Sequence, residues 1–505
     1  MNNINTLGSL IQSGYQSKSI KDELRHNLRE KIKSGKPVFE GVHGFENTVI
    51  PELERAILSR HNINLLGLRG QAKTRLARKM IELLDEYMPI VDGSEINDDP
   101  LQPISRFAKD LIAEKGDATP IKWIHRSERF FEKLATPDVT VADLIGDVDP
   151  IKAANLKLSY ADDRVIHFGM IPRANRCIFV INELPDLQAR IQVALFNILQ
   201  EGDIQIRGFK LRMPLDMQFV FTANPEDYTN RGSIVTPLKD RIESQILTHY
   251  PKSVETALGI TEQEADISPE QKEKVIISDL IKRLIEQVAF EARESEMVDK
   301  KSGVSARLTI AAYENAVSAA ERRAIINGEE NTQVWLSDLT GIIPSITGKI
   351  ELVYEGEQEG PYQVAVNLVE RAIRNQFTQY FPSPETLKKR KTADKPTENP
   401  YKAIISWFDS GNSLDLFLET KDEDKMQLLY KVSGLHALVK KYFHTSNEKE
   451  TALLMELVLH GLAAHSLISK KVIDGKIEFK DLMGSMLNMS NEHFDEEDFN
   501  EEDYN

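Results

Sequence analysis

A lysine and a threonine end a short, glycine-containing loop in the first part of the chain. The octapeptide GLRGQAKT, residues 67–74, matches the phosphate-binding pattern G-x-x-x-x-G-K-[ST] except that Ala72 replaces the final glycine. In such a loop, backbone N–H groups converge on phosphate oxygens, the lysine reaches the β- and γ-phosphates, and the hydroxyl ligates Mg²⁺. Lys73 and Thr74 supply these two side chains. We therefore expect the loop to bind a nucleotide.

The residues around this loop favour the same interpretation. The apolar INLL precedes it and the amphipathic RLARKMIELLDEYM follows it, which predicts a strand, a loop and a helix in that order. Ala72 directly precedes the lysine that opens the helix, so we expect helical dihedral angles at Ala72. A methyl group is harmless at such angles, whereas a positive φ would favour glycine.

Two further apolar stretches end in polar residues. RCIFVINEL, residues 176–184, ends near Asn182 and Glu183, and FVFTAN ends at Asn224. Phosphoryl transfer to water needs a carboxylate that orients the water and an oxygen ligand that supports Mg²⁺. Glu183 suits the first task, whereas the uncharged Asn182 would support Mg²⁺ only through a water molecule. Because ligands gather at the carboxyl ends of parallel strands, we expect Asn224 beside Glu183 and the γ-phosphate.

Simpler interpretations of these polar residues stay open. Asn182 and Glu183 could cap the next helix, and Asn224 could form an Ala-Asn-Pro turn. Arg241 in TPLKDRI and Arg307 in SARLT could stabilise transition-state charge across a subunit boundary, or could be solvated surface side chains.

The elements that must position these residues follow from the hydrophobic pattern. Strand and helix signals alternate from about residue 45 to 250, which predicts an α/β domain whose parallel sheet is covered on both faces. Helical periodicity dominates afterwards, and residues 381–400 carry four prolines and a basic KKRK, typical of a linker. We predict an N-terminal helical segment (1–40), an α/β nucleotide-binding domain (41–252), an all-α lid (253–350), a helical segment with a linker (351–400), a helical module (401–490) and an acidic disordered tail (491–505).

Charge and composition exclude several other classes of protein. The net charge is −16, and the last fourteen residues hold eight acidic side chains, so a nucleic-acid duplex is disfavoured as a partner. No stretch approaches eighteen apolar residues and the first residues do not form a secretory leader, so we expect a cytoplasmic protein without a membrane segment. The single Cys177 lies in an apolar run, which favours a buried thiol, and the eleven histidines form no ligand cluster.

Long stretches of the chain resemble one family of nucleotide-dependent enzymes. These stretches are TPDVTVADLIGDVDP, HFGMIPRANRCIFVINELPDLQARIQVALFNILQEGDIQIRG and TANPEDYTNRGSIVTPLKDRI. Over about residues 38–345 the sequence resembles the AAA+ ATPases, and within them the branch of MoxR and magnesium-chelatase subunit I. The resemblance implies an AAA+ P-loop fold with an insert in the second helix (LKLSYADDRVIHFG) and a hairpin (EGDIQIRGFKLRMPL) before the sensor 1 strand.

The resemblance also assigns roles to individual residues. It implies ATP and Mg²⁺ as cofactors, Glu183 as the Walker B glutamate, Asn224 as sensor 1, Arg241 as an arginine finger and Arg307 as sensor 2. It places Mg²⁺ at Thr74 and, through water, at Asn182, which stands where the family has an aspartate. The nucleotide-binding residues that it implies are Val42, His43 and Gly44 near the adenine, and Gly67, Leu68, Arg69, Gly70, Gln71, Ala72, Lys73, Thr74 and Arg75 at the phosphates.

Several functions remain open at this point. The resemblance implies a ring, commonly a hexamer, that hydrolyses ATP to remodel a protein client together with a partner carrying a von Willebrand factor A (VWA) domain. A magnesium-chelatase motor subunit is an alternative. An ATP-gated scaffold with little hydrolysis is another, supported by Asn182, and a DNA-remodelling ATPase is disfavoured by the net charge. The client, the ring size and the role of residues 401–505 do not follow from the sequence.

Overall fold

The computed structural model describes residues 4–157, 165–201, 203–204, 206, 213–225, 233–385, 399–473 and 475–482. The chain divides into two units, residues 1–250 and 251–505. The predicted acidic tail lies outside the described residues, as do most of the linker and parts of both predicted hairpins.

A five-stranded parallel sheet is the centre of the first unit. Its order is β11 (Ser244–Leu247), β1 (Ile63–Leu66), β10 (Met217–Ala223), β7 (Cys177–Asn182) and β4 (Phe130–Leu134). In chain order this is 5-1-4-3-2, with the predicted phosphate-binding loop directly after the first strand. The predicted fold class, an AAA+ P-loop fold, is therefore confirmed.

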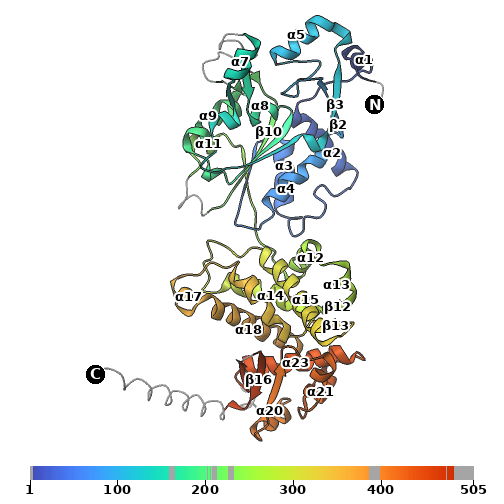
Figure 1. Cartoon of the computed structure of the whole chain (residues 1–505), viewed down its shortest axis with the longest axis vertical. Helices are drawn as coiled ribbons and strands as arrows, with labels where there is room; N and C mark the ends of the chain where they lie inside the picture. The colour runs from blue at the N-terminus through green and yellow to red at the C-terminus, as the bar shows by residue number, and fades with distance from the viewer. Residues whose placement is uncertain are drawn as a thin grey trace, which may run out of the picture. The chain divides into compact units, whose positions relative to one another are not determined.

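Alternate residues of the central strands face opposite layers of the core. In β7, Phe179 and Ile181 pack into one hydrophobic cluster, and Ile178 and Val180 pack into another. Helices α9 (Ala189–Glu201) and α11 (Thr236–Asp240) lie on the first side; on the other side lie α2 (Ile20–Lys33), α3 (Val49–Leu58) and α4 (Lys73–Lys79) (Figure 1). Burial on both faces explains why most residues of the central strands are apolar.

Shorter elements complete the first unit. An antiparallel pair, β2 with β3, is joined to residues 4–17 by a bridge from Thr6 to Pro120 and by the Trp123 Nε1 hydrogen bond to the Ile4 carbonyl, 2.9 Å. Antiparallel pairs β5–β6 and β8–β9 flank the two predicted hairpins. These elements are α1 (Leu7–Gln12), η1 (Met80–Leu83), β2 (Tyr87–Val91), α5 (Arg106–Lys115), η2 (Gly116–Ala118), β3 (Ile121–His125), η3 (Arg126–Glu128), α6 (Val141–Leu144), β5 (Gly146–Val148), α7 (Pro150–Leu156), β6 (Ile166–Phe168), α8 (Met170–Arg173), η5 (Leu184–Asp186), β8 (Asp203–Ile204) and β9 (Met213–Pro214).

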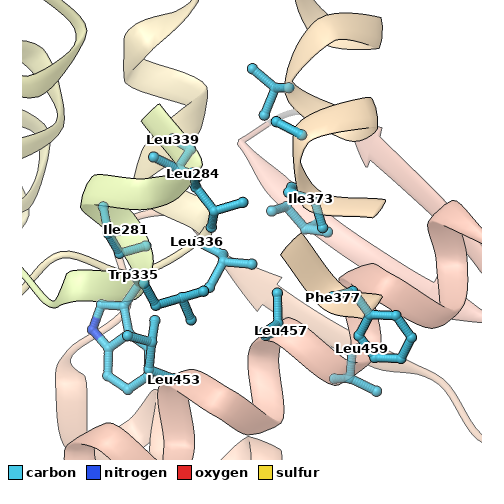
Figure 2. Close-up of a cluster of buried hydrophobic side chains, with 14 of the residues drawn as sticks. Ile281, Leu284, Trp335, Leu336, Leu339, Ile373, Phe377, Leu453, Leu457 and Leu459 are labelled. Atoms are coloured by element: carbon cyan, nitrogen blue, oxygen red, sulfur yellow. The ribbon is translucent and has the colours of Figure 1, made fainter. Parts of the chain in front are cut away.

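The second unit is built on long helices around one hydrophobic core. Figure 2 shows side chains from α14 (Asp279–Glu294), α18 (Pro361–Tyr380) and α23 (Glu448–Ala464) meeting in one cluster, with Trp335 at one edge of it. The cluster runs from Val275 to Phe479, so residues 399–482 and the helices before them share a single interior.

The remaining elements of the second unit include strands that the sequence analysis did not predict. A three-stranded antiparallel sheet, β14-β16-β15, and a short parallel pair, β12-β13, occur where only helices were expected. The elements are α12 (Val254–Glu264), α13 (Pro269–Lys274), β12 (Val275–Ile276), α15 (Arg307–Asn327), β13 (Thr332–Gln333), η6 (Ser337–Ile342), α16 (Ile343–Thr347), α17 (Tyr354–Glu359), α20 (Lys402–Asp409), β14 (Leu414–Phe417), α21 (Asp422–Tyr430), α22 (Leu435–Tyr442), β15 (Ser469–Ile473) and β16 (Lys476–Lys480).

Buried charges join parts of the second unit that are distant in sequence. Arg323 of α15, 2% exposed, donates to Asp422 Oδ1 at 2.7 Å and to Asp338 at 3.2 Å. Glu286 of α14 is also 2% exposed, and its Oε1 accepts a hydrogen bond from Thr261 at 2.5 Å.

Within the described part of the chain, no helix has the length and apolar character that a membrane crossing requires.

Candidate nucleotide site

The segment after strand β11 holds the predicted phosphate-binding loop, residues 67–74, in place. The Thr248 hydroxyl donates to Gln71 Oε1 at 2.8 Å, and the Tyr250 hydroxyl donates to the Arg69 carbonyl at 2.8 Å. A Cβ added at Gly67 would collide with Thr248 Oγ1 and Gln71 Oε1. Any larger residue at the first position of the loop would therefore force Thr248 and Gln71 out of the contact that they make with each other.

Ala72 has a left-handed backbone conformation. Its φ and ψ are 53° and 18°, and Gly70 also has a positive φ of 70°. The prediction of helical angles at Ala72 was therefore wrong: helix α4 begins only at Lys73, and the loop needs a left-handed residue to turn into it. In this region the Cβ approaches the following carbonyl oxygen, which costs an alanine about 1–2 kcal/mol. The missing glycine is a real departure from the family pattern, because this position has the conformation that glycine adopts without strain.

Lys73 and Asn224 meet at the carboxyl ends of β1 and β10. The Lys73 ammonium is buried, and it donates to Asn224 Oδ1 at 2.7 Å, to the Leu68 carbonyl at 3.0 Å and to the Gly67 carbonyl. The Asn224 amide in turn donates to Glu183 Oε2 at 2.9 Å. Asn224 thus links the lysine of the loop to the carboxylate at the end of β7. The sequence predicted Asn224 beside Glu183 but did not predict its contact with Lys73.

Asn182 lies between the loop and the edge strand β4. Its Oδ1 is 3.5 Å from Thr74 Oγ1 and accepts a hydrogen bond from the Thr222 hydroxyl at 3.1 Å. Its Nδ2 donates to Glu132 Oε1 at 2.6 Å. Glu183 has left-handed angles, φ 55° and ψ 50°, and its backbone N–H donates to Thr222 Oγ1 at 3.2 Å.

Two partners of Asn182, Glu132 and Thr222, were not predicted from the sequence. Glu132 lies in FFEKL, a mixed apolar and charged stretch that was not recognised as a strand, and Thr222 lies inside the apolar run of β10. The available signal for Glu132 was its place in β4, the first strand of the five-stranded sheet that follows the loop helix in the chain. In a parallel sheet that strand can run beside β7, which brings its side chains close to the polar end of β7.

The segment expected near the adenine is attached to the same part of the sheet. Thr48 Oγ1 lies 2.8 Å from His249 Nε2, and the rings of Phe45 and His249 meet edge to face with centroids 5.1 Å apart. Among the predicted contacts, Val42 is buried in the core, whereas His43 is exposed. The Gly44 N–H donates to Glu46 Oε1 at 3.0 Å.

The two predicted arginines lie in different units. Arg241 follows α11; its Nη1 donates to the Pro237 carbonyl at 2.8 Å, and its guanidinium lies 5.3 Å from the centroid of the Phe196 ring. Arg307 is the first residue of α15 in the second unit, where it is exposed. The last predicted phosphate contact, Arg75, is partly buried in α4.

The residues present fit a nucleotide bound with Mg²⁺. The left-handed turn at Gly70 and Ala72 forms the kind of backbone concavity that binds anions, and Lys73 places a cation inside it. The hydroxyl of Thr74 and the amide oxygen of Asn182 are hard oxygen donors of the type that Mg²⁺ prefers. Among the described residues, no group of three or more His, Cys, Asp or Glu side chains is arranged to hold a metal ion by itself.

The comparisons with known proteins give only distant similarities. No family model matches the chain, and no curated protein matches it. Among solved structures, the BchI and BchD subunits of magnesium chelatase give 17% identity over 64% of this chain and 98% of that chain, with a TM-score of 0.33. Hsp104 with ATPγS and casein gives 13% identity over 64% of this chain and 52% of that chain, with a TM-score of 0.37. RuvB of Thermotoga maritima gives 10% identity over 76% of this chain and 87% of that chain, with a TM-score of 0.31. These similarities bear on the fold only.

Proposed function

We propose that this protein binds Mg²⁺-ATP at residues 67–74 and hydrolyses it, and that hydrolysis remodels or activates a protein partner. The observation that carries this proposal is the hydrogen-bonded series from Lys73 through Asn224 to Glu183. A phosphate-binding lysine, a polar sensor and a carboxylate from three adjacent strands meet at one sheet edge. That combination serves phosphoryl transfer to water.

Each side chain then has a definite task. Lys73 binds the β- and γ-phosphates, while the Thr74 hydroxyl and the Asn182 amide oxygen are the groups that would hold Mg²⁺. The metal neutralises charge on the phosphate oxygens. Glu183 orients the attacking water by accepting its hydrogen bond, and Asn224, which contacts Glu183, fixes where that carboxylate lies.

The proposal includes assembly into a ring, for which a hexamer is our working hypothesis. In the AAA+ enzymes that the sequence resembles, an arginine of one subunit completes the nucleotide site of the next, and we assign this role to Arg241. Partners with a VWA domain, typical of the MoxR branch, are the first candidates for the protein that hydrolysis acts on. Mixing of inactive variants tests whether two subunits share a nucleotide site, and affinity capture would identify the partner.

One observation favours a second function, an ATP-gated scaffold with little turnover. Asn182 carries no charge where related enzymes have an aspartate, and its amide is already engaged by Thr222 and Glu132. Weak support for Mg²⁺ would slow hydrolysis more than binding. ATP would then act as an assembly signal.

Nucleotide binding and turnover separate these functions. We would measure binding of a fluorescent ATP analogue and steady-state Mg²⁺-ATP hydrolysis over a range of protein concentrations. Turnover per subunit should rise with concentration, and Glu183→Gln should abolish turnover but retain binding. Lys73→Ala should lose binding, whereas the control Lys79→Ala, at the other end of the same helix, should retain it. Binding that is unchanged in Lys73→Ala would refute the site, and tight binding without turnover would favour the scaffold.

Mixing two inactive variants tests whether sites are shared between subunits. Arg241→Ala has an intact water-orienting glutamate and lacks the finger, whereas Glu183→Gln has the finger and lacks the glutamate. If Arg241 acts on a neighbour, the mixture should recover activity at interfaces where an intact finger meets an intact glutamate. Absence of recovery in mixtures shown to co-assemble would contradict this role.

A further inference from the structure

Glu132 places a carboxylate next to Asn182, which has an amide instead of a carboxylate. It lies on β4, which pairs in parallel with β7 so that Leu134 stands opposite Asn182. Glu132 Oε1 accepts the Asn182 Nδ2 hydrogen bond at 2.6 Å, the distance of a strong, charge-assisted contact. Its other oxygen accepts a hydrogen bond from Arg78 Nε at 2.9 Å, and 24% of the Glu132 side chain is exposed.

The contacts on both sides of Asn182 determine which way its amide points. A carboxylate can only accept, so the amide nitrogen must face Glu132. On the other side, the Thr222 hydroxyl accepts the Glu183 N–H, which leaves its own proton to donate to Asn182 Oδ1. Both partners therefore select the same orientation, with the amide oxygen toward Thr74.

We propose that Glu132 and Asn182 together replace the single Walker B aspartate. In this arrangement Asn182 provides the oxygen atom on the side of the metal, and Glu132 provides the negative charge one hydrogen bond further away. Glu132 orients the amide and polarises its oxygen, and so increases the affinity of the site for the Mg²⁺ that accompanies a nucleotide. Glu132 is thus a positioning residue. This inference rests on the proposed nucleotide-binding function.

Arg78 contacts the Glu132 carboxylate from the solvent side. Its side chain is 61% exposed and pairs with Glu132 Oε2 at 2.9 Å. An exposed pair of this kind is weak and is screened by salt, so Arg78 holds the carboxylate in place without cancelling its charge at Asn182. Removing Arg78 should leave the negative charge beside Asn182 intact, which makes Arg78→Gln a matched control for Glu132→Gln.

The test measures Mg²⁺ affinity rather than turnover. We would titrate Mg²⁺ into protein with a fluorescent ATP analogue and record the Mg²⁺ concentration at half-maximal binding. Glu132→Gln should raise this concentration at least tenfold, the effect typical of losing a partner of a metal-binding side chain. Binding in EDTA should be unchanged. Arg78→Gln should remain close to the native protein.

A rescue experiment guards against misfolding as the explanation. Asn182→Asp in the Glu132→Gln background returns the charge to the usual position, and the half-maximal Mg²⁺ concentration should return to within about threefold of the native value, well inside the tenfold loss. If the native protein needs Mg²⁺ for tight binding but Glu132→Gln does not change the Mg²⁺ requirement, this inference is wrong and the proposed function stands. If the native protein binds no Mg²⁺-nucleotide, the proposed function itself has failed.

Discussion

Replacing Glu286 by glutamine should change how the second unit responds to pH. Glu286 lies on α14 with its carboxylate next to Thr261 and is almost fully buried. Removal from water raises its pKa from an ordinary 4.5 to about 7, and the hydrogen bond from Thr261 and the charge of Arg293 oppose that rise only in part. Glutamine has nearly the same shape, can accept the same hydrogen bond, and does not ionise in this range.

The direction and size of the effect follow from proton linkage. Because the pKa of Glu286 is raised in the folded state, the folded state binds the proton more tightly than the unfolded state does. The stability that this proton contributes is complete below pH 4.5 and is lost as the pH rises to 7. With a pKa of about 7 in the folded state against 4.5 in the unfolded state, ionisation of Glu286 lowers the unfolding free energy by about 3 kcal/mol at pH 8 and by about 1 kcal/mol at pH 5. Glu286→Gln should therefore stabilise the unit by about 2–3 kcal/mol more at pH 8 than at pH 5.

Tryptophan fluorescence can isolate the second unit in the full chain. The chain has three tryptophans, and in a Trp123→Phe background the other two, Trp335 and Trp407, both report on residues 251–505. Urea unfolding at pH 5 and pH 8 would be compared for this background with and without Glu286→Gln. The control is Glu294→Gln, an exposed residue at the end of the same helix. A gain from Glu286→Gln that is equal at both pH values would refute the reasoning.

Three further changes test other features of the structure. Ala72→Gly should increase the unfolding free energy of the first unit by about 0.5–1 kcal/mol, the left-handed cost to alanine minus the extra unfolded-state entropy of glycine; a decrease in thermal stability would contradict the left-handed assignment. Arg323→Met leaves Asp338 and Asp422 buried without their shared cation and should cost about 3–5 kcal/mol in urea unfolding, so an unchanged midpoint would disprove the importance of this network. Burial raises the pKa of the Cys177 thiol to about 12, so a thiol reagent at pH 8 should label it only in denaturant, and rapid labelling of the native protein would show that the strand is accessible.

The sequence predicted the centre of the sheet better than its edges. Strands β1, β7 and β10 are buried on both faces, so they are mostly apolar runs that can be recognised without a structure. The rule that ligands gather at the carboxyl ends of parallel strands then places Lys73, Glu183 and Asn224 together. The edge strands β4 and β11 are short and only partly buried, and their mixed sequences FFEKL and SQIL resemble loops. Glu132 was missed for that reason.

Two other failures have different causes. The left-handed angles of Ala72 are imposed by closure of the loop between β1 and α4, so its position directly before the helix-opening lysine misled the prediction. Strand β16 (KIEFK) carries its lysines and glutamate on one face and its apolar residues on the other, whereas β15 (SKKVI) has no such alternation, and both strands are too short for periodicity to distinguish them from a helix. The Asp-Gly pair at 474–475 between them was the overlooked hairpin signal.

The shared interior of residues 251–385 and 399–482 determines what cutting the chain would do. A protease that cleaves between Glu385 and Asn399 breaks the backbone without removing any of the contacts around Trp335, Phe377 and α23. The two fragments should therefore remain associated under native conditions and separate only in denaturant. Each fragment made alone would expose the apolar face that the other covers, and so would aggregate unless both were synthesised together.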